Sequence, residues 1–254
     1  MAEPPANRQP IRNVLVTGGS RGLGLGIANK LAASGYRVIA LARKPTNELT
    51  AAIAKVERQG PGVLCFVGFD LGDIGEIPKL IRGLRAKFGP LFGLVNNAAV
   101  GHAGVLATMH NADIEHLVRI NTLAPIILTK HVVRAMMAEG SGRVVNIASI
   151  IGFTGYTGLS AYAATKASML GFSRSLAREV GRLGITVNAV APGFLNTDMT
   201  HGLADDQRQR IIGRSALRRL ADVEDVAGAV DYLLSDAARN ITGTVLTIDA
   251  GATA

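Results

Sequence analysis

The chain has 254 residues, of which 48% are hydrophobic and 18% charged, and this balance excludes a disordered chain. The formal net charge is +8, which invites a nucleic-acid or acidic partner, but aromatic residues make up only 4% and Trp is absent. Because stacking side chains are few and the Lys and Arg residues are dispersed, we expect no nucleic-acid binding.

Membranes, disulfides and metals are also not expected. No stretch approaches the roughly 18 to 20 consecutive apolar residues that a membrane-spanning helix needs. A single cysteine, Cys65, excludes an internal disulfide and fits a reducing, cytoplasmic location. The five histidines show neither an H-E-x-x-H pattern nor a cysteine partner at ligand spacing, so we expect no metal site.

The chain begins with a segment that differs from the rest. Residues 1–10 hold three prolines and no apolar run, which predicts a flexible N-terminal tail without the hydrophobic segment of a secretory signal. From there to residue 254, no linker, charge block or repeat interrupts the pattern. We therefore expect one domain spanning residues 11–254.

Short apolar runs recur along this domain, separated by stretches long enough for helices. They are residues 13–17, 37–42, 63–69, 91–99, 142–149, 185–191 and 244–249, and the first helix is predicted at 22–34. Continuous rather than alternating apolar strands indicate burial on both faces, as in a parallel sheet covered by helices. The predicted fold class is α/β, a single-domain, doubly wound Rossmann-like sheet.

A glycine-rich turn lies between the first strand and the first helix. It reads TGGSRGLG over residues 17–24, and glycines there let the backbone approach a pyrophosphate at the helix N-terminus. The alternative is a tight structural turn without a ligand. The predicted phosphate-binding residues are Gly18, Gly19, Ser20, Arg21, Gly22, Leu23 and Gly24.

The end of the second strand indicates which dinucleotide binds. In NAD-binding relatives of this architecture an acidic residue there accepts from the ribose 2′-hydroxyl, but this chain has Arg43 and Lys44. Arg43 can pair with a 2′-phosphate, and Arg21 can approach from the glycine turn. The pattern favours NADPH, and the alternative is a solvated strand end.

Tyr162 and Lys166 lie four residues apart, hence on one face of a predicted helix that starts near Ala161. A nearby ammonium stabilises a phenolate and brings the pKa of a phenol toward neutrality, which suits a proton donor. Ser149 ends an apolar strand beside the start of that helix and can hold a substrate oxygen. Asn121 is polar within an apolar, helix-like segment, so it has a functional hydrogen-bond role or is a satisfied core residue.

A long excursion follows the strand at 185–191. Residues 193–219 break the strand and helix rhythm after a strand end, where open α/β sheets bind ligands, and long excursions are often lids. We expect this segment to shape the substrate pocket.

Taken together, the motifs TGGSRGLG, NNAA, the Asn of RINT, Ser149, YAATK and PGFLNTDMT resemble the short-chain dehydrogenase/reductase family over about residues 13–251. More narrowly, SLAREVGRLGITVNAVAPGFLNTDMT and ITGTVLTIDAG look like those of 3-oxoacyl-(acyl-carrier-protein) reductases. The resemblance implies about seven parallel strands and a homotetramer. It also implies a substrate, a 3-oxoacyl thioester reduced with NADPH to the 3-hydroxyacyl thioester.

By this resemblance, Tyr162 is the general acid, Ser149 orients the carbonyl, Lys166 binds the nicotinamide ribose and lowers the phenol pKa, and Asn121 supports a water that links Lys166 to solvent. The implied cofactor contacts add Asp70 and Leu71 beside the adenine, Asn97 near the ribose with Ala98 next to it, and Leu195 and Thr197 at the nicotinamide end. Tyr162 is, like Lys166, also among the implied cofactor contacts. One departure is Ala99, where the family usually has glycine, and we expect so small a change to be tolerated.

An acyl carrier protein is acidic, and five basic residues could steer it: Lys130, Arg134, Arg174, Arg178 and Arg182. The last three lie at successive four-residue steps of the helix that starts near Ala161, which predicts one basic stripe. The alternative is an ordinary solvated face. Two other functions stay open: reduction or oxidation of a free ketone, secondary alcohol or sugar, and a non-catalytic dinucleotide-binding sensor or scaffold.

Overall fold

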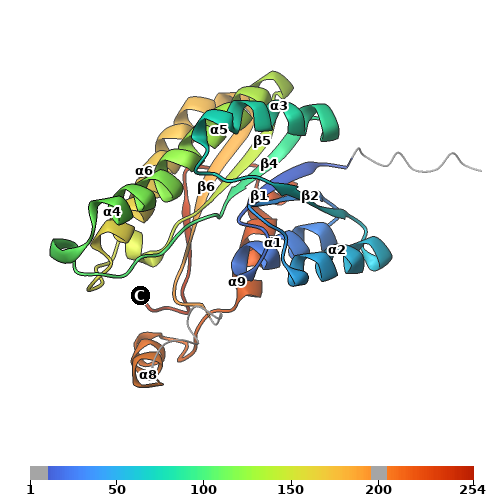
Figure 1. Ribbon diagram of the computed structural model, residues 1–254. Helices are drawn as coiled ribbons and strands as arrows, with labels where there is room; N and C mark the ends of the chain where they lie inside the picture. Colours follow the sequence, from blue (N-terminus) through green and yellow to red (C-terminus); the bar gives the residue numbers. More distant parts are fainter. Residues whose placement is uncertain (1–10, 196–204) are drawn as a thin grey trace, which may run out of the picture.

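The computed structural model describes residues 11–195 and 205–254 (Figure 1). Within these residues, seven strands form one parallel sheet in the order β3-β2-β1-β4-β5-β6-β7, which confirms the predicted fold class. The strands are β1 (Asn13–Thr17), β2 (Arg37–Ala42), β3 (Val63–Gly68), β4 (Leu91–Asn96), β5 (Gly142–Ile147), β6 (Ile185–Pro192) and β7 (Val245–Ile248). Each predicted apolar run forms one of them.

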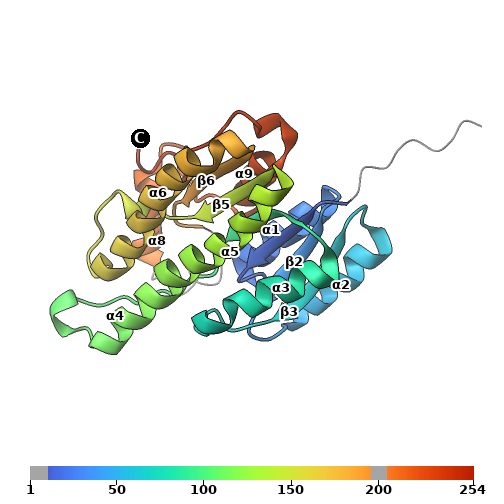
Figure 2. The same cartoon turned by 90° about the horizontal axis from the view of Figure 1, so that it is seen from above.

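Helices cover both faces of the sheet. They are α1 (Gly22–Ala33), α2 (Asn47–Gln59), α3 (Ile77–Phe88), α4 (Asn111–Val118), α5 (Ala124–Glu139), α6 (Ser160–Val180), α8 (Asp205–Arg214) and α9 (Val223–Leu234). α1, α2 and α9 cover one face, and α3, α5 and α6 cover the other (Figures 1 and 2). In the described ranges, no helix combines the length and the hydropathy needed to cross a membrane.

Two apolar clusters hold these layers together. Successive residues of β1 point to opposite faces, so Val14 and Val16 join the cluster under α1 and α9, while Leu15 joins the cluster under α3, α5 and α6. The side chains of β1 and β6 are buried along their full length, as expected for central strands of a covered parallel sheet. The continuous apolar runs of the sequence therefore have a direct structural cause.

A network of hydrogen bonds between buried polar side chains links α5 and α6 to the sheet. Asn96 and Asn146 are register partners on β4 and β5, and Asn96 Nδ2 donates to Asn146 Oδ1 at 2.8 Å and to Thr129 Oγ1 of α5 at 2.8 Å. Asn146 Nδ2 then donates to Ser173 Oγ of α6 at 2.8 Å. Because unpaired polar groups are costly in a core, these bonds specify one position for α5 and α6.

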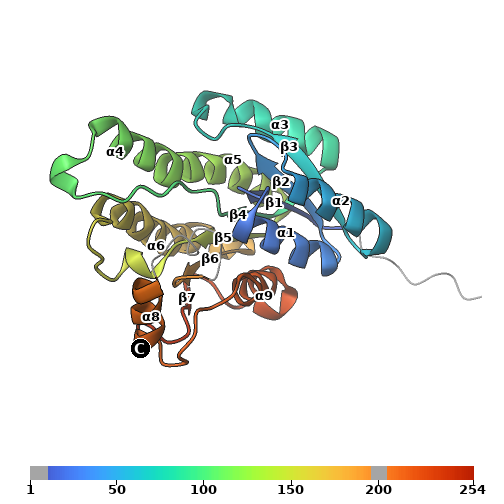
Figure 3. The same cartoon turned by 60° about the horizontal axis from the view of Figure 1, so that its bottom comes forward.

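The centre of the sheet is a topological switch point. β1 lies between β2 and β4, so the connections after β1 and after β4 leave toward opposite ends of the sheet. In open α/β sheets, ligands bind in the crevice outside the carboxyl ends of the strands at such a point. α8 lies apart from both helical layers (Figure 3), within the long excursion that the sequence analysis singled out.

Candidate active site

The glycine-rich turn joins β1 to α1 at the switch point. Gly18 and Gly22 have positive φ angles of 66° and 53°, a backbone conformation that favours glycine. Gly24 packs against the turn so closely that a Cβ there would lie 2.1 Å from the carbonyl oxygen of Gly18. The glycines at 18 and 24 are therefore required by the packing of the turn itself.

Gly22 is different, because an added Cβ there would meet open space. It begins α1, whose N-cap residue, Arg21, is exposed and makes no side-chain cap hydrogen bond, and whose first turn has no acidic residue. A helix N-terminus with uncapped N–H groups stabilises an anion, and no carboxylate of the first turn competes for it. These residues fit the pyrophosphate of a dinucleotide.

The carboxyl ends of β1 and β4 are joined by hydrogen bonds that the sequence analysis did not foresee. Thr17 Oγ1 accepts from the backbone N–H groups of Asn97 at 2.9 Å and Ala98 at 3.0 Å. In return, Asn97 Nδ2 donates to the carbonyl oxygen of Thr17 at 2.9 Å. The glycine turn and the NNAA segment are thus joined into one surface. The sequence feature that could have indicated this link is Thr17, a polar residue at the end of an apolar strand.

At the end of β2, Arg43 and Lys44 are exposed. Thr46, the N-cap of α2, donates from its hydroxyl to the carbonyl oxygen of Ser20 at 2.6 Å, which holds α2 against the glycine turn. After β3, Asp70 is exposed, and its carboxylate accepts from the backbone N–H of Gly72 at 2.8 Å. Leu71 packs partly against the core. The sequence-predicted dinucleotide contacts 18–24, 43, 70–71 and 97–98 therefore follow the carboxyl ends of β1, β2, β3 and β4.

Tyr162 and Lys166 lie near the start of α6, as the four-residue spacing predicts. The Lys166 side chain is buried, and Nζ donates to the carbonyl oxygen of Ile147 on β5 at 2.9 Å. The same Nζ lies 5.7 Å from the centroid of the Tyr162 ring. Burial lowers the pKa of Lys166 to about 8, because the charged form loses its hydration.

Ser149 follows β5 and begins the short helix η4 (Ile150–Gly152), where its Oγ accepts from the backbone N–H of Ile151 at 3.2 Å. Burial raises the pKa of the Tyr162 phenol, and a hydrogen bond with the Ser149 side chain acts in the opposite direction. The structure therefore brings together the two oxygens that the sequence analysis paired. A phenol held beside a hydroxyl in this way can donate to a shared acceptor such as a carbonyl oxygen.

Asn121 lies in a turn of π-helix, η3 (Arg119–Leu123), inserted between α4 and α5 where the sequence pattern indicated regular helix. π-Turns of this kind are frequent at functional sites. Asn121 Oδ1 accepts from the N–H of Val100 at 2.8 Å, and Nδ2 donates to the carbonyl oxygen of Val100 at 2.8 Å and to Thr165 Oγ1 at 3.2 Å. Its amide thus connects the segment after β4 to α6, one residue before Lys166.

The remaining predicted residues follow β6. Leu195 is buried and forms an isolated bridge with Ala221. Thr197 lies outside the described residues, as does part of the excursion at 193–219.

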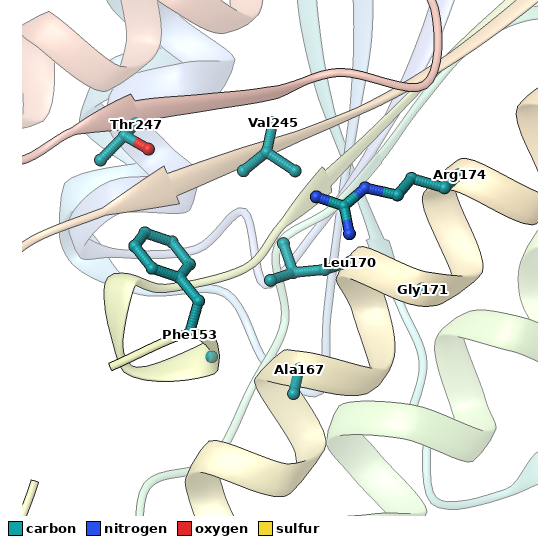
Figure 4. A pocket seen from close by; sticks show the side chains of 8 residues that line it. Phe153, Ala167, Leu170, Gly171, Arg174, Val245 and Thr247 are labelled. Atoms are coloured by element: carbon teal, nitrogen blue, oxygen red, sulfur yellow. The ribbon is translucent and has the colours of Figure 1, made fainter. Parts of the chain in front are cut away.

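A cavity of about 500 Å³ lies between η4, α6 and β7 (Figure 4). It is lined by Gly152, Phe153, Ala167, Leu170, Gly171, Arg174, Val245 and Thr247. The side chains of Phe153, Leu170 and Val245 point into it. Since Ser149, Tyr162 and Lys166 are not in its lining, this cavity is distinct from the group around the phenol.

A parallel sheet with a dinucleotide-type turn and a Ser, Tyr and Lys group at its carboxyl edge defines a class of nicotinamide-dependent oxidoreductase. A family model described as short chain dehydrogenase matches residues 12–208. The chain belongs to the short-chain dehydrogenase/reductase family and is an oxidoreductase of that family, which uses a nicotinamide cofactor.

Among individual proteins, the chain is similar to 3-oxoacyl-[acyl-carrier-protein] reductase FabG of Escherichia coli (strain K12). The two are 41% identical over 237 residues, which cover 93% of this chain and 95% of the relative. FabG of Vibrio harveyi is 38% identical over 239 residues, covering 93% and 95%. FabG of Staphylococcus aureus (strain Mu50 / ATCC 700699) is 32% identical over 240 residues, covering 94% and 97%.

Proposed function

We propose that the protein reduces a 3-oxoacyl thioester, with NADPH, to the 3-hydroxyacyl thioester. The observation that carries the proposal is the group of Ser149, Tyr162 and Lys166 at the carboxyl ends of the central strands, in a chain 41% identical to a 3-oxoacyl-[acyl-carrier-protein] reductase. An intact proton-donor group also argues against the alternative of a non-catalytic dinucleotide sensor.

In this mechanism the Ser149 hydroxyl and the Tyr162 phenol both donate to the ketone oxygen of the substrate. NADPH, when bound, supplies the hydride that reduces the carbonyl carbon. As negative charge develops on the oxygen, Tyr162 transfers its proton to it. Lys166 stabilises the phenolate that remains and binds the nicotinamide ribose, and Asn121 supports a water through which the site regains a proton from solvent.

The choice of NADPH over NADH rests on Arg43. Its guanidinium is exposed where a ribose 2′-phosphate would lie, and no carboxylate ends β2 to accept from a free 2′-hydroxyl. We expect Arg43→Ala to raise the KM for NADPH about tenfold, since a charge-assisted hydrogen bond contributes roughly 1.5 to 3 kcal/mol, and to change the KM for NADH little.

Steady-state kinetics with both dinucleotides would measure this effect. Arg58→Ala is the matched control, because Arg58 is an exposed arginine of α2 whose Nε donates to the carbonyl oxygen of Ala54 within the same helix, at 3.1 Å. An unchanged KM for NADPH in the Arg43 variant would mean that Arg43 is only a solvated strand end.

The rate of NADPH oxidation with different carbonyl compounds tests the proposed substrate class. We expect acetoacetyl thioesters to be reduced with kcat/KM at least about tenfold above that for free ketones, because a thioester arm adds binding energy that the small ketone lacks. A panel of thioesters, free ketones and sugars makes the comparison. Faster reduction of a free ketone or sugar than of every thioester would favour the alternative substrate class.

We propose an acidic acyl carrier protein as the natural thioester partner. Lys130, Arg134, Arg174, Arg178 and Arg182 are exposed, and within the described part of the chain none of them forms an ion pair. α6 ends at Val180, so Arg182 lies in the short helix η5 (Gly181–Leu183) and not on the regular stripe that four-residue spacing predicted. If these residues steer the carrier, added salt should lower kcat/KM for the carrier-bound substrate more than for the small thioester.

We also propose a homotetramer. Its support, besides the family resemblance, is the exposure of three apolar side chains: Val118 of α4, Leu123 of η3 and Met137 of α5 are each more than 40% exposed. Scattered apolar residues are common on surfaces, but these three lie on consecutive elements. Sedimentation equilibrium of the full chain measures the assembly directly.

A further inference from the structure

Two aromatic rings meet beside the proposed active site. The rings of Tyr156 and Phe194 have their centroids 5.7 Å apart with an interplanar angle of 55°, a favourable tilted arrangement. Tyr156 lies between η4 and α6, and Phe194 follows β6.

The pair connects the two segments that frame the proton donor. Tyr156 lies in the connection that runs from Ser149, after β5, to Tyr162, at the start of α6. Phe194 follows the end of β6 at Pro192, after Gly193, and precedes Leu195. Because β5 and β6 are paired neighbours in the sheet, the two rings lie at the same carboxyl edge as the Ser149 and Tyr162 oxygens.

The Tyr156 ring is accessible, with 43% of the residue exposed, and in the described residues its hydroxyl forms no hydrogen bond. The backbone N–H of Gly104 donates to the carbonyl oxygen of Gly158 at 2.9 Å, which brings the segment after β4 to this connection. That segment carries Val105 and Leu106, 61% and 54% exposed. Two large apolar side chains, each more than half exposed, thus lie on a segment that contacts the connection carrying Tyr156.

We propose that Tyr156, supported by Phe194, forms the surface that binds the acyl chain of the substrate and so determines its preferred length. This inference rests on the proposed function. A 3-oxoacyl thioester whose ketone lies at Tyr162 has two arms, a polar thioester arm and an apolar chain, and the ring pair offers apolar area at the same edge of the sheet. Longer chains gain affinity by covering this exposed ring surface, whereas an acetoacetyl group is too short to cover it.

Phe153 provides a contrast within the same connection. It is 48% exposed, but its ring points into the cavity between α6 and β7, toward Val245 and Leu170 (Figure 4). An acyl chain that followed Phe153 would enter a cavity whose lining does not include Tyr162. Tyr156 and Phe153 therefore differ in what their rings contact: Tyr156 packs on Phe194, whereas Phe153 lines the cavity.

The test is a series of 3-oxoacyl N-acetylcysteamine thioesters of four, eight and twelve carbons, with kcat/KM measured by NADPH oxidation. For Tyr156→Ala we expect the ratio of kcat/KM between the twelve-carbon and four-carbon substrates to fall about tenfold, the scale of losing a few methylene contacts in an apolar site. Tyr156→Phe should keep the wild-type ratio, because the ring and not the hydroxyl carries the contact.

Tyr232→Ala and Phe153→Ala are the controls, since Tyr232 is 45% exposed on α9 and Phe153 lines the other cavity. Both should retain the wild-type ratio, and circular dichroism checks that each variant is folded. An unchanged ratio in Tyr156→Ala, or an equal change in Phe153→Ala, overturns this inference while thioester reduction by the wild type still supports the proposed function. If the wild type reduces no thioester, both fall together.

Discussion

Tyr162→Phe is expected to lower kcat for thioester reduction about a thousandfold, the range over which a positioned general acid contributes. The substitution removes one oxygen from a ring that is already largely enclosed, so packing around α6 should change little. The hydride can still be delivered, but the alkoxide must then take its proton from water. Initial rates of NADPH oxidation with an acetoacetyl thioester measure the loss.

Two further measurements show whether the loss is chemical. The affinity for NADPH, followed by fluorescence titration, should stay within about threefold of wild type, because a transition-state interaction and not ground-state binding is removed. Tyr232→Phe, at an exposed tyrosine of α9, should retain full activity. A Tyr162→Phe enzyme with more than a tenth of wild-type kcat would contradict the proposed general acid.

Much of the framework behind this site is visible in the sequence because its causes are local. Runs such as residues 13–17 and 185–191 carry apolar residues on both sides of the pleat, which is typical of a strand covered on both faces, and the structure buries both. The Tyr162 and Lys166 pair follows from helical spacing alone. Gly18 and Gly22 stand where the backbone takes positive φ between a strand and a helix.

The parts that could not be predicted depend on contacts between segments distant in the sequence. The Thr17 hydroxyl bonds to Asn97 and Ala98, about eighty residues away, and no local pattern encodes that partner. The π-turn at Asn121 was also hidden, because its apolar spacing differs little from that of an α-helix over five residues. Arg182 left the predicted stripe because glycines at 181 and 184 end α6 early.

Lys166 shows how the site trades stability for chemistry. Its ammonium is buried against β5, and within the described residues it donates to a neutral carbonyl oxygen rather than to a carboxylate. A buried charge without a counter-ion disfavours the folded state, and perturbed pKa values of this kind gather at functional sites. In the proposed mechanism this cost is tolerated because the ammonium, 5.7 Å from the centroid of the Tyr162 ring, stabilises the phenolate.

Lys166→Met should therefore inactivate the enzyme and stabilise the fold at neutral pH. We expect kcat to fall at least about a hundredfold, since the phenolate loses its cation. Lowering the pKa of Lys166 from 10.5 to about 8 corresponds to at most ~3 kcal/mol of folding free energy. The lost hydrogen bond to Ile147 offsets about 1 kcal/mol, so the variant should be more stable at pH 7 by about 2 kcal/mol.

The pH dependence of the stability difference between Lys166→Met and wild type tests this prediction more strictly. Between about pH 8 and 10.5 the unfolded chain keeps the Lys166 proton and the folded chain loses it, so wild-type stability rises with pH over this window relative to the variant. Below pH 8 both states are protonated and the full penalty applies. The stability advantage of Lys166→Met should thus shrink steadily from pH 8 and be lost by about pH 10.

Urea denaturation of both proteins at pH 7, 8.5 and 9.5, analysed as differences, isolates this group from the other titrations. Lys55 is an exposed lysine of α2, so Lys55→Met controls for adding an apolar side chain. Its stability relative to wild type should not change with pH. A Lys166→Met protein that is less stable than wild type by the same amount at all three pH values would show that the ammonium is fully compensated in the fold. Lys166 would then be a stabilising residue, and its burial would no longer indicate a site that sacrifices stability for proton transfer.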